Sequence, residues 1–143
     1  NTTVLPGLHY SYYEGEIRRT SEIEKLTVSA KGISPTVSIE KAVKNENFAL
    51  AFTGYIKIPK DGKYTFYLNS NDGSILELDE SVLIDNDGAH SSFEKEAPLA
   101  LHKGFHSIKI KYFQNGGISK LTFSWKSIDF EKCEVPDSVL FHS

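Results

Sequence analysis

The sequence has a single cysteine, no excess of basic charge and no long apolar run. Cys133 is alone among the 143 residues, so the chain can form neither an internal disulfide framework nor a zinc site of several cysteines. The net charge of -3 argues against a nucleic-acid-binding surface, which needs basic excess on one face. No segment approaches the roughly 18 apolar residues that a membrane span requires.

Signals of targeting and of a second domain are also missing. The chain starts at Asn1 without a methionine or a signal peptide, which predicts a piece cut from a longer, processed polypeptide. A length of 143 residues with 39% apolar content predicts one domain, spanning 1–143, with one packed core. The lack of disulfides favours a bacterial source.

Apolar residues that recur at every second position predict β-strands. The clearest run occupies the even positions from 48 to 58, and further strands are expected over 64–68, 76–78, 82–84, 105–112 and 121–125. Phe105 breaks the alternation of Ile108, Ile110 and Tyr112, which predicts a bulge near Ser107.

Helix signals are poor. A single helical turn is expected at 21–26, with Ser21 as the cap and Glu24 at the third position. Many short strands separated by regular turns are typical of an antiparallel sandwich or barrel. The predicted fold class is therefore all-β with little helix.

Two polar turns built on Asp-Gly, at 70–74 and 85–90, hold most of the candidate ligand oxygens. One interpretation is that their side chains only cap the local backbone, as is usual for Asn and Asp in turns. The other is a calcium site, because calcium prefers six to eight carboxylate, amide and carbonyl oxygens. The oxygens for such a site would come from Asn71, Asp72, Asp85, Asp87 and Asn115.

Sugar binding needs polar groups and usually an aromatic face. Phe93 lies outside the alternation, in the expected loop after His90, and is the best candidate for a sugar platform. His90 could donate a hydrogen bond to a sugar hydroxyl. Trp125 is in phase with Leu121 and Phe123, which predicts a place in the core.

Catalysis is not expected. Glycoside cleavage would need two carboxylates flanking a pocket, one with a raised pKa. Asp72, Asp85 and Asp87 all lie in solvated turns without apolar surroundings, and no nucleophile motif accompanies them.

Seven short phrases occur in an order that resembles the PA-14 domain, named for the anthrax protective antigen and shared by yeast flocculins and adhesins. The resemblance covers the chain from about 8 to 141. The phrases are GLHYSYYEG at 7–15, FTGYI at 52–56, DGKYTFY at 61–67, SNDGS at 70–74, DNDGAH at 85–90, KGFH at 103–106 and YFQNGG at 112–117.

The resemblance implies a β-sandwich that binds carbohydrate or packs against a neighbouring domain. In the calcium-dependent lectins of the family, two adjacent aspartates joined by a cis peptide bond bind the metal, together with an Asn and carbonyls of a later loop. Here these positions correspond to Asn71, Asp72 and the loop at Asn115. Asn71 replaces the first aspartate, so calcium affinity should fall, because it depends on the number of charged ligands.

These observations predict a non-catalytic carbohydrate-binding module of a carbohydrate-active enzyme, located outside the cell, in the periplasm or on the cell surface. The alternative is a structural module that packs on a catalytic domain and shapes access to its active site. The expected partners are a glycan and other domains of the parent polypeptide. The predicted sugar-binding residues are Asn71, Asp72, Asp87, His90, Phe93 and Asn115.

Overall fold

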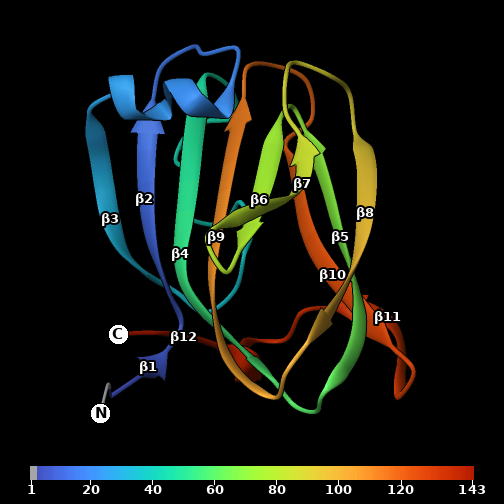
Figure 1. The fold of residues 1–143 in the computed structure, drawn as a ribbon. Helices are drawn as coiled ribbons and strands as arrows, with labels where there is room; N and C mark the ends of the chain where they lie inside the picture. Colours follow the sequence, from blue (N-terminus) through green and yellow to red (C-terminus); the bar gives the residue numbers. More distant parts are fainter. Residues whose placement is uncertain (1–2) are drawn as a thin grey trace.

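The computed structural model describes residues 3–143 as two antiparallel β-sheets packed face to face (Figure 1). Two short 3-10 helices, η1 (Thr20–Lys25) and η2 (Asp137–Val139), interrupt the strands. The strands are β1 (Leu5–Pro6), β2 (Leu8–Glu14), β3 (Val28–Ser34), β4 (Phe48–Ile58), β5 (Gly62–Asn71), β6 (Ser74–Leu78), β7 (Ser81–Asn86), β8 (Phe93–Leu101), β9 (Gly104–Gln114), β10 (Lys120–Ser127), β11 (Phe130–Glu134) and β12 (Leu140–His142). The all-β prediction is confirmed.

The larger sheet has eight strands and the smaller has four. In the larger sheet, β4 pairs with β9 along its whole length on one side and with β2 and then β12 on the other. The hairpin of β6 and β7 extends this sheet beyond β9. The smaller sheet has the order β11-β10-β5-β8 (Figure 1).

The core lies between the two sheets and follows the period-two pattern. Phe48, Leu50, Phe52, Ile56 and Ile58 of β4 are all buried on its inner face, as predicted. Aromatic rings of the smaller sheet meet them in stacked pairs, such as Phe66 and Phe123 with ring centroids 5.9 Å apart. Trp125 is 4% exposed and stacks on Tyr64, so its predicted place in the core is confirmed.

A smaller apolar cluster lies on the outer face of the larger sheet, under η1. Ala49 and Phe113 of the sheet pack there against Ile17 and Ile23. The expected helical turn is present, but as a 3-10 helix that begins one residue earlier.

The expected cap of that turn is wrong. Glu22, and not Glu24, accepts hydrogen bonds from the backbone N–H groups of Arg18 and Arg19. The helix follows Arg19, so Ser21 lies inside it and does not cap it.

The bulge predicted near Ser107 is also absent. The pairing of β4 with β9 runs without a shift through Ser107, which lies opposite Tyr55. Ile108, Ile110 and Tyr112 point into the core, whereas Phe105 is 46% exposed on the outer face. The broken alternation therefore reflects an aromatic residue on the other face of a regular strand.

No helix among residues 3–143 is long and apolar enough to cross a membrane.

Candidate functional site

The turn at 70–74 is built into one end of the sandwich, against the end of β9. The backbone N–H of Asp72 donates to the carbonyl of Phe113, and the N–H of Phe113 donates to the carbonyl of Gly73. The peptide bond between Asn71 and Asp72 is cis. A Cβ built on Gly73 would lie 2.6 Å from the carbonyl oxygen of Gly88, so the turn at 85–90 packs directly against it.

Asp72 connects three loops through its carboxylate. Oδ1 accepts a hydrogen bond from the backbone N–H of His90 at 3.0 Å, and Oδ2 accepts one from the N–H of Asn115 at 2.8 Å. The residue is only 7% exposed. We call the segments joined in this way, 71–73, 88–90 and 115–117, the loop cluster.

Asn115 completes the loop cluster and carries an unpartnered oxygen. Its side-chain Nδ2 donates to the carbonyl of Ile17 at 2.8 Å, which fixes the amide plane. Its Oδ1 is buried without a hydrogen-bond partner among the described residues. A Cβ built on Gly117 would lie 3.5 Å from Nδ2 of Asn71, so this loop also passes close to the Asn71 amide. The structure thus brings Asn71, Asp72 and Asn115 together.

The donor set of the loop cluster has the chemistry of a calcium site with one charged ligand. A buried amide oxygen without a partner is costly unless something binds it. Calcium takes such oxygens together with carboxylates. Within 3–143, no three His, Cys, Asp or Glu side chains are placed to share a metal, so a cation here would depend on amide and backbone oxygens.

The turn side chains also carry out the local capping that the alternative interpretation predicted. Ser70 Oγ donates to the carbonyl of Asp72 and lies 2.6 Å from Ser74 Oγ. Asn86 Nδ2 donates to the carbonyl of Phe93 at 2.9 Å, which joins the start of β8 to this network. The two interpretations are therefore compatible, because capping uses Ser70, Ser74 and Asn86 and leaves Asn115 Oδ1 free.

His90 and Phe93 form the rim of the loop cluster. The ring nitrogens of His90 lie 2.7 Å from the carbonyl of Ser91 and 2.8 Å from that of Asn86, so the backbone holds the imidazole in place. Phe93 was expected in a loop, but it is the first residue of β8, paired with Ser70. Its ring is 55% exposed, edge-on to His90 at 6.5 Å.

Asp87, which the sequence analysis predicts to bind sugar, holds η1 in place. Its Oδ1 accepts the backbone N–H of Thr20 at 2.9 Å, and its Oδ2 accepts the Thr20 hydroxyl at 2.8 Å. Asp85 caps the turn by accepting the N–H of Asp87. Through these two bonds to Thr20 the Asp87 carboxylate anchors η1 beside the loop cluster.

Tyr112 supports the loop cluster from the core side. Its hydroxyl donates to the carbonyl of Asn71, inside the core. Burial, with a smaller effect of the nearby Asp72 carboxylate, raises the pKa of Tyr112 above its usual value. The hydroxyl therefore remains a donor at any physiological pH.

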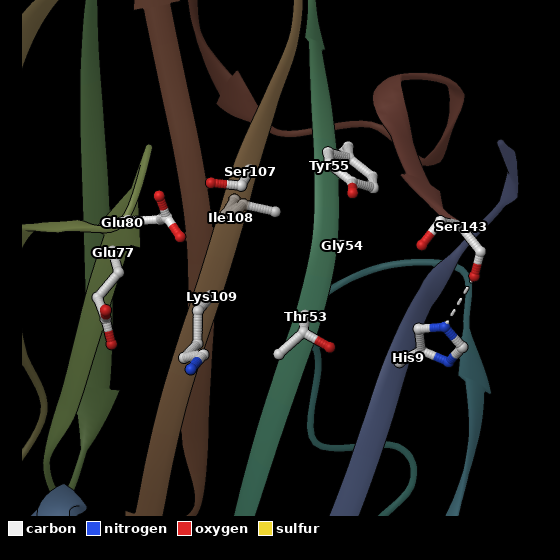
Figure 2. Close-up of a pocket in the computed structure, with 10 residues that line it drawn as sticks. All are labelled: His9, Thr53, Gly54, Tyr55, Glu77, Glu80, Ser107, Ile108, Lys109 and Ser143. Atoms are coloured by element: carbon white, nitrogen blue, oxygen red, sulfur yellow. Dashed lines mark hydrogen bonds between the residues drawn. The ribbon is translucent and has the colours of Figure 1, made fainter. Parts of the chain in front are cut away.

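A separate hollow of about 400 Å³ lies on the outer face of the larger sheet (Figure 2), and no pattern in the sequence predicts it. It is lined by β2, β4, β6 and β9, by the turn between β6 and β7, and by Ser143. Only the pairing of these strands brings the side chains together, and no local motif marks them.

Residues 6–138 match the family model of the PA14 domain. The chain belongs to the PA14 domain family. The match covers the loop cluster and strands β2 to β11, and it confirms the resemblance found in the sequence.

Two curated relatives contain a segment similar to this domain. The anti-sigma-I factor RsgI3 of Acetivibrio thermocellus is 27% identical over 105 residues, which cover 73% of this chain and 16% of that protein. A β-hexosaminidase of Porphyromonas gingivalis is 32% identical over 95 residues, covering 66% of this chain and 11% of that protein. The chain thus spans less than a fifth of either relative.

Solved structures share the fold. An anti-sigma factor domain-containing protein from Clostridium clariflavum superposes with a TM-score of 0.83 at 22% identity, over 97% of this chain and 48% of that one. A PA14 sugar-binding domain from an RTX adhesin superposes with a TM-score of 0.80 at 15% identity, over 97% of this chain and 99% of that one. At such identities the likeness establishes the fold alone.

Proposed function

We propose that this PA14 domain is a non-catalytic glycan-binding module and that the loop cluster is its sugar site. The observation that carries the proposal is the convergence of Asn71, Asp72 and Asn115, with the buried Oδ1 of Asn115 left without a partner. The RTX adhesin domain, a PA14 sugar-binding domain of the same fold, supports the ligand class.

A calcium ion would be held by the Asp72 carboxylate and the amide oxygens of Asn115 and Asn71. Each Asp72 oxygen accepts one N–H bond, and a carboxylate oxygen has a second lone pair for a cation. When bound, the ion supplies positive charge that attracts sugar hydroxyl oxygens. The chain's own contribution is to fix the Asp72 carboxylate and the Asn115 amide through bonds to the backbone before any ligand arrives.

The exposed ring of Phe93 is the apolar surface of the proposed site. A sugar ring presents C–H groups on one face, and an aromatic ring at the rim can cover them. His90 keeps its ring at the edge of Phe93, which limits the orientations of the platform.

The proposed setting is a secreted or surface protein in which this domain accompanies others. The two relatives support this, because each carries the PA14-like segment as a small part of a longer chain. The β-hexosaminidase also favours a second candidate role, packing beside a catalytic domain and shaping access to its active site. Such a role would leave the domain without glycan affinity of its own.

Thermal unfolding in millimolar calcium, compared with unfolding in a chelator, tests whether the domain binds calcium. A ligand at 100 times its dissociation constant stabilises the folded state by about 2.7 kcal/mol, so we expect a higher midpoint in calcium. Asn71→Asp should enlarge the shift, because it adds a charged ligand of the same size.

Ser138→Asp, which adds equal charge at an exposed position of η2, is the control and should respond like the wild type. The proposed calcium site would be refuted if calcium left the unfolding midpoint unchanged in both the wild type and Asn71→Asp.

A further inference from the structure

The outer face of the larger sheet carries a trough made of two adjoining hollows, of about 400 and about 180 Å³. The hollows share His9, Thr53 and Lys109, so they form one continuous depression. The larger hollow lies in the range of small-ligand pockets, about 300–1,000 Å³. The smaller one extends it to Ile23 and Glu24 of η1.

Small side chains make the floor of the trough. Ala51, Thr53 and Gly54 lie along β4, and Ser107 lies on the neighbouring strand β9, opposite Tyr55. Glu77 and Glu80 of the β6–β7 hairpin stand on one side of the floor, and His9 and Ser143 stand on the other (Figure 2). The depression therefore results from the small side chains on the two paired strands β4 and β9.

Polar groups point into the trough with unused hydrogen-bonding capacity. The hydroxyls of Thr53 and Ser107 make no hydrogen bond to the described residues, and neither do the carboxylates of Glu77 and Glu80. Lys109 lies directly opposite Glu77 on the neighbouring strand, yet no ion pair joins them. The trough thus offers donors and acceptors to a ligand.

Aromatic rings continue the trough at the end away from η1. Tyr55 lines the larger hollow and lies opposite Phe141 in the pairing of β4 with β12. Phe141 packs edge-to-face against Phe105 of β9, with centroids 5.5 Å apart. Phe105 is 46% exposed, with Lys57 above its ring. From Ala51 to Lys57 this surface is about 20 Å long at 3.3 Å per residue.

We propose that the trough is a second glycan-binding site, which takes several residues of a neutral polysaccharide. A sugar chain uses hydroxyl donors and acceptors and covers aromatic rings with its C–H faces, and the trough supplies both kinds of partner. The two hollows are lined by three carboxylates, of Glu24, Glu77 and Glu80, and two ammonium groups, of Lys109 and Lys111, so the charges nearly balance and disfavour a strongly charged ligand. Interface cores between proteins are depleted of Lys and Glu, which disfavours a protein partner here.

This site is separate from the loop cluster and does not depend on it. The 3-10 helix η1 stands between them: Thr20 is bonded to Asp87 beside the loop cluster, while Glu24 closes the trough and lies 3.7 Å from Lys111. A ligand in the trough contacts strands, whereas a ligand in the loop cluster contacts loops.

The proposal can be tested by NMR of the isotopically labelled chain. The chain is titrated with soluble fragments of xylan, mannan and mixed-linkage β-glucan, and its amide signals are followed. At least one of these probes should shift amides of β4 and β9 around Thr53 and Ser107. Thr53→Arg fills both hollows and should weaken that binding at least about tenfold, while Asp72→Ala should leave it unchanged.

Thr122→Arg is the matched control, because Thr122 is half-buried on β10 of the other sheet and lies outside the trough. If Thr53→Arg lowers the unfolding midpoint strongly, the pair Glu77→Gln and Lys109→Gln replaces it, since both side chains keep nearly their size.

Three results would overturn the proposal. One is that no probe shifts the β4 and β9 amides. Another is that a folded Thr53→Arg binds as the wild type does, with shifts only in the loop cluster. The last is self-association in analytical ultracentrifugation that Thr53→Arg abolishes, which would assign the face to a second copy of the chain.

Discussion

Replacing Asp72 by Asn should loosen the loop cluster even without any ligand. The Asp72 carboxylate accepts two backbone N–H bonds, from His90 at 3.0 Å and Asn115 at 2.8 Å. An amide has one oxygen, so Asp72→Asn keeps one bond and turns an NH₂ group toward the other N–H. Bonds to a charged group contribute about 1.5–3 kcal/mol each, and the orphaned N–H adds a desolvation cost.

We therefore expect Asp72→Asn to lower the free energy of unfolding by about 2–4 kcal/mol. For a chain of this size, that corresponds to a midpoint roughly 6–12 °C lower. Differential scanning calorimetry in chelator measures this effect without any contribution from calcium. Asp137→Asn is the control, because Asp137 is exposed in η2 and its carboxylate makes no hydrogen bond or ion pair within residues 3–143. An unchanged midpoint for Asp72→Asn would show that the carboxylate does not hold the loops together.

Two further substitutions test the packing and the ion pairs around the fold. Gly73→Ala should destabilise the domain by about 1–3 kcal/mol in urea unfolding, because its Cβ would meet the Gly88 backbone at 2.6 Å, whereas Gly116→Ala should be tolerated. Burial lowers the pKa of His106, but hydrogen bonds to the His102 carbonyl and the Asp79 carboxylate outweigh it and raise the pKa. The charged His106 thus stabilises the fold below its unfolded pKa of about 6.5, and this contribution is lost as the pH rises through the raised value. His106→Gln should lower the midpoint more at pH 5.5 than at pH 8.5, and an equal loss at both would contradict this.

The strands that line the core could be predicted, since burial imposes a period of two. β4 shows this best, because each of its even apolar positions is buried. β3 gave no such signal: it lies at a sheet edge, and most of its residues are exposed. With few core contacts, nothing selects alternating apolar side chains there.

The residues of the loop cluster could be predicted from the sequence, whereas the contacts of their side chains could not. Asn71 and Asp72 could be matched to Asn115 only through the family resemblance, because 43 residues separate Asp72 from Asn115. The role of Asp87 depends on Thr20, which lies 67 residues away and carries no pattern that predicts the contact. The prediction of a bulge at Ser107 was wrong for a related reason, because Phe105 lies on the outer face of the sheet and not in the core.

The central claim, that the loop cluster binds sugar, is tested most directly by glycan-array binding in calcium of the wild type, Asp72→Ala and Thr53→Arg. The account predicts glycans that the wild type and Thr53→Arg bind and that Asp72→Ala, shown to be folded by circular dichroism, does not. Binding of the same glycans by the folded Asp72→Ala, or no binding by the wild type, would contradict it.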